Sequence, residues 1–415
     1  MVAPVPNPIV VVGIGADGWD GLPVGSRTAI EHADVVFGSA RQIAEVREHC
    51  TETRTWPSPL VPNLRPMLDA CAGARVCVLA SGDPMFHGIG VTLVREFGAD
   101  RVRVHPAPSS VSLACARLGW ALQDTSTVSL VNTPAETVLP ELADGRRILV
   151  LSRGSSTPGE IAAVLCANGF GSSDLTVLEQ LGGPAERVVG GIARESTFEG
   201  VDPLNVVALL CVRDPDAARH TRIPGLADSA YTGDGQMTKR EVRALTLSAL
   251  APAPGELLWD IGGGSGTIAI EWMRTDRSCR AVTFESSQAR REQIETNALR
   301  LGVPGLVVHD DAPESFAAVS DSDSVPDAVF IGGGLTGADM LEACWKAVRT
   351  GGRVVANSVT AESDSLLLTA AAKYGGELRR FQIYRGEPLG AFTTWRPQLP
   401  VTQWCATKQW TATER

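Results

Sequence analysis

Two short glycine-rich turns, each directly after an apolar run typical of a β-strand, are the segments of this chain most suited to binding a nucleotide-like ligand. The first turn extends from Gly13 to Gly18 and follows the apolar residues 9–12. The second extends from Asp260 to Gly266 and follows residues 257–259. Because glycine has no Cβ, backbone N–H groups in such turns can approach a polar ligand closely. The sequence therefore predicts two separate nucleotide-type sites.

The second turn has the spacing Asp260-x-Gly262-x-Gly264-x-Gly266 and leads into an apolar helix, with Glu285 at the end of the next expected strand. An acidic residue at that strand end can accept hydrogen bonds from both ribose hydroxyls, in NAD sites and in S-adenosylmethionine sites alike. A pyrophosphate requires G-x-G-x-x-G, a spacing that this turn lacks. A carboxylate here would repel a diphosphate but could pair with the ammonium group of S-adenosylmethionine. The turn favours a methyl donor, and the alternative is a glycine turn that binds nothing.

The first turn, Gly13-x-Gly15-x-x-Gly18, matches the dinucleotide fingerprint letter for letter. Its surroundings do not. A dinucleotide-binding helix should begin within the glycines, whereas here the helix is expected to begin near Val24. The acidic partner is also misplaced, because Asp34 precedes the following strand and does not end it. A nicotinamide-dependent oxidoreductase is therefore an alternative interpretation, but a weaker one.

Composition narrows the possible functions. The formal net charge of −10 argues against a nucleic-acid groove, and with it against an RNA methyltransferase. Apolar residues make up 44% of the chain and charged residues 20%, without an apolar run long enough to span a membrane and without a secretory leader. A cytoplasmic protein is expected. The nine cysteines show no CxxC spacing, so we expect neither a metal site nor disulfides.

At 415 residues the chain is expected to form two α/β domains. Expected strands alternate with helical segments in both halves, which is an α/β pattern. In the second half this repetition predicts a parallel, doubly wound sheet with ligands at the carboxyl ends of its strands. Residues 1–212 are the predicted first domain, residues 213–237 a turn-rich linker, and residues 238–415 the second domain, which opens with a capping-box spacing from Thr238 to Glu241. The expected strands are residues 9–12, 76–80, 101–105, 148–152, 175–179, 205–212, 257–260, 280–285, 306–309, 327–331 and 353–358.

The second half resembles the class I methyltransferases through its Asp-x-Gly-x-Gly turn and the acidic residue that ends the next strand. By this resemblance the half is a Rossmann-like domain, and residues 310–313 fall where such enzymes contact adenine. The implied donor-binding residues are Thr238, Asp260, Gly262, Gly263, Gly264, Ser265, Gly266, Glu285, Asp311 and Ala312.

The first half resembles the tetrapyrrole (class III) methyltransferases, in which the donor lies between two α/β subdomains. The resemblance is carried by the order of four segments, residues 81–84, 106–110, 178–184 and 203–207, and Asp83-Pro84 is its most specific element. Taken singly, Asp83 could be an ordinary turn residue and Ser109 an ordinary helix cap. The implied donor-binding residues are Ala16, Gly82, Asp83, Phe86, Ser109 and Ser110.

The fusion of these halves resembles the bifunctional, decarboxylating precorrin-6Y methyltransferases of cobalamin biosynthesis. The resemblance implies two S-adenosylmethionine sites per chain and a metal-free reduced precorrin-6 substrate. It also implies methylation of ring carbon 5 by the first half, and methylation of carbon 15 with loss of the ring C acetate carboxyl by the second, giving precorrin-8. A homo-oligomer is expected from the same resemblance. A tetrapyrrole-binding module without activity is a further alternative.

A precorrin carries many carboxylates, so basic residues in the second half are candidate substrate contacts. No nucleophile–base pair stands out in the sequence, and no catalytic residue is assigned. Each basic candidate could equally be an ordinary surface residue. The candidates are Lys239, Arg240, Arg385 and Arg396.

Overall fold

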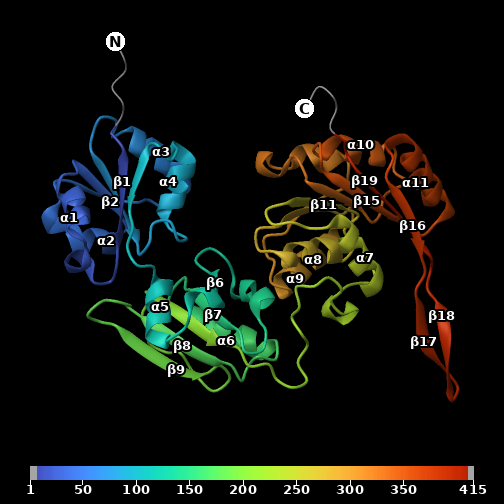
Figure 1. Ribbon diagram of the computed structural model, residues 1–415, viewed down its shortest axis with the longest axis horizontal. Coiled ribbons are helices and arrows are strands. Elements are labelled where there is room, and N and C mark those ends of the chain that lie inside the picture. The colour runs from blue at the N-terminus through green and yellow to red at the C-terminus, as the bar shows by residue number, and fades with distance from the viewer. Residues whose placement is uncertain (1–6, 410–415) are drawn as a thin grey trace, which may run out of the picture. The chain divides into compact units, whose positions relative to one another are not determined.

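The computed structural model describes residues 7–409 of the chain, and these residues form two compact α/β units (Figure 1). The first unit comprises the described residues up to 135 together with residues 143–218. The second comprises residues 136–142 and the described residues from 219 onward. The α/β architecture expected from the sequence is thus present in both units.

The first unit begins with a five-stranded parallel sheet in the order β3-β2-β4-β1-β5. Its interior strand β1 (Ile9–Ile14), between β4 and β5, has Val11 and Val12 fully buried, one in each of two clusters of buried side chains. Burial on both faces explains why this strand is an uninterrupted apolar run. The other elements are β2 (Val35–Gly38), β3 (Thr53–Thr55), β4 (Val76–Ser81), β5 (Val102–His105), α1 (Val24–Glu31), α2 (Ala40–Val46), α3 (Val61–Asp69) and α4 (Ile89–Phe97).

The second sheet of this unit has the order β6-β7-β10-β8-β9. It is mixed, because β10 runs antiparallel to both of its neighbours while β6 and β7 are parallel. The alternation of strands and helices along the chain did not reveal this antiparallel pairing. Its elements are β6 (Thr125–Ser129), β7 (Arg147–Leu151), β8 (Asp174–Glu179), β9 (Arg187–Ile192), β10 (Asn205–Leu210), α5 (Ser110–Leu118) and α6 (Thr157–Ala167).

The second unit is built on a seven-stranded sheet in the order β13-β12-β11-β14-β15-β19-β16. The five strands predicted from the sequence are all parallel, as expected, whereas β19, which the sequence did not predict, runs antiparallel to both β15 and β16 at one edge of the sheet. The strand order reverses between β11 and β14, and ligands of such sheets bind at this point. The strands are β11 (Leu257–Ile261), β12 (Arg280–Phe284), β13 (Val307–His309), β14 (Ala328–Ile331), β15 (Arg353–Ser358), β16 (Glu377–Phe381) and β19 (Val401–Thr407).

Helix α7 (Arg240–Leu250) opens this unit, but without the expected capping box. Its N-cap is Lys239, which makes no side-chain cap hydrogen bond. With the N-cap at Lys239 and not at Thr238, Glu241 is not in the third helical position that a capping box requires, and its carboxylate accepts a hydrogen bond from Arg385. The other helices are α8 (Thr267–Thr275), α9 (Gln288–Arg300), α10 (Met340–Ala347) and α11 (Ala361–Tyr374). Short 3-10 turns are Gly18–Gly21, Arg47–His49, Leu122–Asp124, Ala135–Glu141, Asp228–Ala230, Glu314–Ala318 and Asp321–Asp323.

Much of the segment expected to be a linker packs against the second unit. Tyr231 is 6% exposed, and its hydroxyl donates to the buried carboxylate of Glu271 at 2.9 Å. The same carboxylate accepts from the backbone N–H groups of Gly225 and Leu226 and from the fully buried guanidinium of Arg243. One buried ion pair therefore anchors residues 225–231, although this stretch has few apolar side chains.

Two strands, β17 (Tyr384–Leu389) and β18 (Phe392–Pro397), pair only with each other among the described strands. Figure 1 shows this ribbon extending away from β16. Its side chains Phe392 and Trp395 are 79% and 72% exposed. Within residues 7–409, no helix combines the length and apolar character needed to cross a membrane.

Candidate functional site

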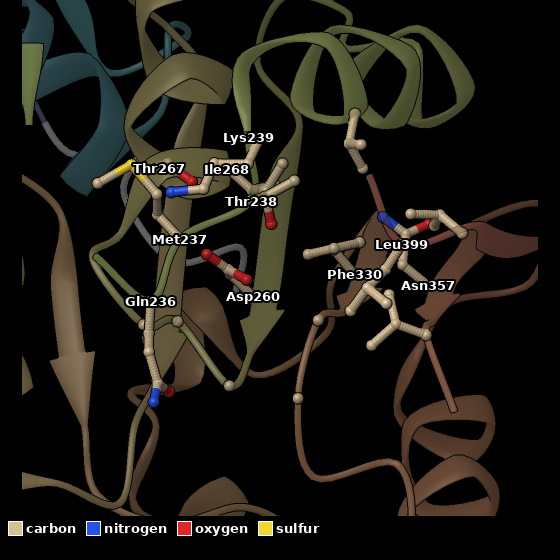
Figure 2. Close-up of a pocket in the computed structure, with 18 of the residues that line it drawn as sticks. Gln236, Met237, Thr238, Lys239, Asp260, Thr267, Ile268, Phe330, Asn357 and Leu399 are labelled. Carbon is tan, nitrogen blue, oxygen red and sulfur yellow. The ribbon is translucent and has the colours of Figure 1, made fainter. Parts of the chain in front are cut away.

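The second unit contains a cavity of about 630 Å³ at the carboxyl ends of β11, β12, β14 and β15. Figure 2 shows Asp260 between the segment that carries Gln236 and Met237 and a group formed by Phe330, Asn357 and Leu399. Of the predicted donor and substrate residues, those lining the cavity are Thr238, Lys239, Asp260, Gly262, Gly263, Gly264, Glu285 and Arg385.

The glycines of the second turn are needed for close backbone packing. Gly262 has a φ of 74°, and a Cβ built on it would lie 2.7 Å from the backbone of Gly333, which follows β14. Gly264 has a φ of 59°, and its Cβ would lie 2.9 Å from the carbonyl oxygen of Gln236. Side chains at either position would separate the strand ends or displace the segment over the turn. The glycines thus let the turn pack closely against its neighbours at the point where the strand order reverses.

Asp260 is 1% exposed and forms part of the cavity wall. Burial raises the pKa of this carboxyl to about 7, against the opposing effect of hydrogen bonds from the Ala269 N–H and the Thr283 hydroxyl, each at 3.3 Å. The nearby carboxylate of Glu285 raises this pKa further. An uncompensated acid in this position is a suitable partner for a cationic ligand group, because an ammonium would offset the cost of burying its charge.

Glu285 directly follows β12 and is 5% exposed. One carboxylate oxygen accepts from the Gly264 N–H at 2.9 Å and the other from the Ser287 N–H at 3.0 Å. These bonds fix the carboxylate, and each oxygen retains a lone pair. The orientation suits the acceptance of hydrogen bonds from ribose hydroxyls. Together with Asp260 and the open turn, it makes the residues present compatible with S-adenosylmethionine.

Four other predicted donor residues are not among the side chains that line the cavity. Ser265 is buried and contacts the Gln236 carbonyl oxygen at 3.4 Å, and Gly266 is the N-cap of α8 with a φ of 77°. Asp311 accepts from the N–H of Ala312, two residues beyond the end of β13. Because β13 neighbours β12, this turn lies at the same sheet edge as Glu285. Ser265 and Gly266 thus adjoin the cavity-lining Gly264 in the chain, while Asp311 and Ala312 follow the strand next to β12.

The basic candidates separate into two groups. Lys239 and Arg385 line the cavity, whereas Arg240 and Arg396 do not. Arg396 lies on the ribbon, where it pairs with Glu387 at 3.0 Å. Arg385 pairs with Glu241 at 2.7 Å, and this bond is the main reason why the pKa of Glu241 lies below its ordinary value.

The first unit contains a smaller cavity, of about 200 Å³, between its two sheets. Residues from the ends of β1 and β4 and from the start of α5 face residues of β7, β8 and β10 across it. All six residues predicted for the first donor site line this cavity, namely Ala16, Gly82, Asp83, Phe86, Ser109 and Ser110.

Two of these six residues also have local structural roles. Asp83 accepts a hydrogen bond from the Met85 N–H at 2.9 Å, which stabilises the turn after β4. Ser109 is the N-cap of α5 and accepts from the Ser112 N–H at 3.1 Å. The neighbouring His87 has a positive φ of 53°, which is uncommon for residues other than glycine. Such strain is frequent where backbone geometry positions a ligand.

The glycines of the first turn do not form a pyrophosphate cradle. A Cβ on Gly13 would lie 2.3 Å from the carbonyl oxygen of Gly82, and one on Gly15 would lie 2.4 Å from the Asp17 carboxylate. Helix α1 begins at Val24, as predicted, and its N-cap Pro23 makes no side-chain cap hydrogen bond. Local packing therefore accounts for the dinucleotide-like spacing: Gly13 packs against the residue after β4, Gly15 against Asp17, and Gly18, with a φ of 59°, against Glu45.

Sequence reasoning missed several cavity residues. In the second unit these include Phe330, Asn357 and the base of the ribbon, represented by Ile383 and Leu399. The signal for Asn357 was its place at the end of an expected strand, while the ribbon has no helical or alternating pattern to reveal it. In the first unit the cavity also contains Arg41, for which the sequence offers no signal. Among the described residues, no group of three or more His, Cys, Asp or Glu side chains could hold a metal.

Comparisons with known proteins match a different family model to each half of the chain. Residues 8–195 match the family model of tetrapyrrole (corrin/porphyrin) methylases, and residues 229–408 match that of the precorrin methyltransferase domain. A precorrin-6Y C(5,15)-methyltransferase [decarboxylating] of Mycobacterium tuberculosis is 47% identical over 97% of this chain and 100% of its own length. One of Sinorhizobium is 46% identical over 96% of both chains.

A solved structure of the C-terminal domain of the precorrin-6Y C5,15-methyltransferase of Rhodobacter capsulatus is 42% identical, with a TM-score of 0.42, and covers 45% of this chain and 100% of that one. The resemblance stated from the motifs is confirmed by the two full-length relatives, and the predicted fold class by the family models. Identity of this degree over nearly the whole chain decides the assignment. The chain belongs to the family of decarboxylating precorrin-6Y C(5,15)-methyltransferases.

Proposed function

We propose that this chain carries out two S-adenosylmethionine-dependent methylations of a reduced, metal-free precorrin-6 and removes one carboxyl group, giving precorrin-8. The observation that carries the proposal is the pair of cavities. One lies within each unit, and each is lined by residues of a different methyltransferase class. Family membership supplies the substrate class, since the full-length relatives are named for C(5,15) methylation with decarboxylation.

Each unit is assigned one methylation. The first unit would methylate carbon 5, with Asp83 and Ser109 at the wall of its donor site. The second would methylate carbon 15 and remove the ring C acetate carboxyl, with Asp260 and Glu285 holding the donor and Lys239 and Arg385 holding substrate carboxylates. The functional division is proposed at residues 1–212 and 238–415, with 213–237 between them.

The donor supplies an electrophilic methyl group when it is bound. The residues of the chain then have to align a ring carbon with that methyl group and exclude water, so catalysis comes mainly from proximity and orientation. The turns after β11 and β14, closely packed at Gly262 and Gly333, provide a rigid floor for such alignment. The precorrin ring can itself accept the electrons released by decarboxylation.

The alternative of a nicotinamide-dependent precorrin oxidoreductase is not favoured. It would require a pyrophosphate at Gly13–Gly18, where the Gly82 carbonyl oxygen and the Asp17 carboxylate occupy the space beside the glycines. An inactive binding module is disfavoured because Asp260 and Glu285 lie in the cavity wall with both carboxylates buried. A buried carboxylate is costly unless it has a partner.

Self-association belongs to the same proposal. A two-stranded ribbon is marginally stable alone in water, and this one exposes Phe392 and Trp395. A second copy of the chain is the proposed partner of the ribbon, in a cytoplasmic protein. Sedimentation of a Phe392→Ser/Trp395→Ser variant tests this. A smaller assembly than that of the wild type supports self-association, and an unchanged mass contradicts it.

Calorimetric titration with S-adenosylmethionine tests the two-site proposal. The wild type should bind two equivalents per chain, Asp83→Ala should lose one, and Glu285→Ala should lose the other. Titration of the doubly substituted chain, expected to bind none, checks that the two losses are independent. A single site in the wild type, or binding of NADPH, would contradict the proposal.

A further inference from the structure

Asn357 lies near the end of β15 and contributes to the wall of the cavity in the second unit. It has neighbours on two other elements. Its Nδ2 donates to the Thr246 hydroxyl of α7 at 2.8 Å, and its Oδ1 accepts from Gln403 of β19 at 3.0 Å. Thr246 is fully buried and Gln403 is 2% exposed. Hydrogen bonds to two buried polar side chains therefore fix the amide of Asn357.

These partners determine which way the amide points. The Thr246 hydroxyl donates its hydrogen to the Val242 carbonyl oxygen at 2.8 Å, so its oxygen can only accept. The nitrogen of Asn357 must therefore face Thr246, and its oxygen must face the Gln403 amide. The second N–H of Asn357 then has no hydrogen-bond partner among the described residues. We infer that it is a fixed, neutral donor at the cavity wall.

Part of the cavity that Asn357 lines is apolar. Phe330, Val242, Val359 and Leu399 line the same cavity, and Figure 2 shows Asn357 grouped with Phe330 and Leu399. Met237 and Gln236 lie at the opposite edge of that view. The cationic residues Lys239 and Arg385 also line the cavity, so it offers two kinds of carboxylate contact.

We propose that Asn357 binds and orients the substrate carboxylate that leaves as carbon dioxide. The proposal deepens the proposed function and rests on it. In this step the bond between the side-chain methylene carbon and the carboxyl carbon breaks, and its electron pair enters the conjugated ring at a protonated imine. The electrons then return to the methylene carbon, which takes up a proton from water to become a methyl group. For overlap with the ring, the breaking bond must stand perpendicular to the ring plane, and a fixed donor can hold it so.

A neutral donor suits the carboxylate that leaves. In the transition state negative charge leaves this carboxylate. A contact whose strength depends on that charge therefore stabilises the ground state more than the transition state, which slows the reaction. A guanidinium carries a full positive charge and can bind a carboxylate through two parallel hydrogen bonds, so it would hold this group more strongly than a neutral amide does and would oppose its loss more. Arg385 and Lys239 suit the carboxylates that remain on the product. The two kinds of contact thus separate retained from lost carboxylates.

The spacing allows both reactions in one cavity. Strand β14 lies between β11 and β15, and neighbouring strands are about 4.8 Å apart, so Asn357 lies about 10 Å from the strand that carries Asp260. A precorrin macrocycle that presents one ring carbon to the methyl donor can therefore place a side chain of another position at Asn357. The substrate need not leave the cavity between the two steps.

The test is Asn357→Asp in the full-length chain, incubated with the precorrin substrate and S-adenosylmethionine. The aspartate keeps the volume and can still accept the hydrogen bond from Gln403, but it loses the bond to Thr246, repels a carboxylate and lacks the donor. Mass spectrometry should show decarboxylated product forming at least about tenfold more slowly, with C5-methylated product that retains its carboxyl group. Asn357→Ala, which removes the donor without adding a charge, should show a smaller decrease.

Asn63→Asp, on α3 of the first unit, is the matched control and should decarboxylate like the wild type. The melting temperature and S-adenosylmethionine binding of each variant establish that the second unit remains folded. Decarboxylation by Asn357→Asp at the wild-type rate overturns the proposal for Asn357 alone. If the wild type itself does not decarboxylate the substrate, the proposed function fails instead.

Discussion

The Arg385 guanidinium donates a hydrogen bond of 2.7 Å to the Glu241 carboxylate, although the two residues are 144 positions apart in the chain. A second carboxylate, that of Asp228, lies 3.8 Å from the same guanidinium. Arg385 also lines the cavity of the second unit. The arginine proposed to bind the substrate is therefore held by carboxylates of the protein, which a substrate carboxylate has to displace.

Replacing Arg385 with glutamine should raise the KM for the precorrin substrate about ten- to a hundredfold, because a charge-assisted hydrogen bond is lost. Affinity for S-adenosylmethionine should not change, since Arg385 is expected to contact the substrate alone. Steady-state kinetics with a separate donor titration measures both. Arg280→Gln is the matched control, because Arg280 begins β12 at the end of the sheet opposite the cavity.

Replacing Glu241 with glutamine should act in the opposite direction. The substitution removes the competing carboxylate and one negative charge from the cavity wall, so the KM for the anionic substrate should fall. A higher KM would mean that Glu241 is needed to orient Arg385, and would contradict displacement as the binding mode.

The first turn offers a test of why its glycines are present. Gly13→Ala would place a Cβ 2.3 Å from the Gly82 carbonyl oxygen, a backbone atom that cannot move without shifting β4. We expect about 1–3 kcal/mol of destabilisation and loss of C5 methylation. Gly154→Ala in the same unit is the control, because no heavy atom lies within 4 Å of its added Cβ. Denaturant unfolding compares the two, and equal stabilities would contradict the packing explanation.

Local pattern was sufficient to predict most elements that position the sites. Apolar runs predicted the central strands of both units, because strands buried on both faces carry few polar residues. The antiparallel pairing of β10, β16 and β19 could not be predicted, since strand direction depends on connections and not on composition. The ribbon of β17 and β18 was missed because Phe392 and Trp395 are exposed, contrary to the usual pattern.

The candidate sites show the same division. The spacing of glycines and acidic residues located the predicted S-adenosylmethionine-binding residues, since these are grouped in short segments at the ends of strands. Contacts between distant residues, such as Arg385 with Glu241 and Gln403 with Asn357, depend on tertiary packing and left no local signal. The motif also could not distinguish Gly262, which packs on Gly333, from a glycine that contacts a ligand.

The buried Glu271 carboxylate provides a stability test. It accepts hydrogen bonds from Gly225, Leu226, Tyr231 and Arg243, and Arg243 is 0% exposed. Glu271→Ala should cost about 3 kcal/mol, because it removes the buried carboxylate of the ion pair and leaves the Arg243 guanidinium with only the partly exposed Asp228 carboxylate, at 3.2 Å, to offset its charge. Limited proteolysis should then cleave within residues 219–231, which the wild type protects. Glu292→Ala, at an exposed position of α9, should change stability by no more than about 0.5 kcal/mol.

The last prediction concerns pH and Asp260. Burial raises the pKa of this carboxyl from 3.8 to about 7, so the folded state binds its proton more tightly than the unfolded state does. The resulting stability is fully present below pH 3.8 and is lost as pH rises through 7. Asp260→Asn cannot ionise, so the variant should gain stability relative to the ligand-free wild type as pH rises from 4 to 7, up to about 4 kcal/mol.

Urea unfolding of both proteins at a series of pH values measures this difference and cancels the titration of every other group. A difference that stays constant with pH, or that shrinks as pH rises, would contradict a raised pKa at Asp260. Bound S-adenosylmethionine should reverse the effect in the wild type, because its ammonium stabilises the ionised carboxylate. Calorimetry near pH 6 in buffers of different ionisation enthalpy should therefore detect proton release on binding, and Asp260→Asn should abolish that release.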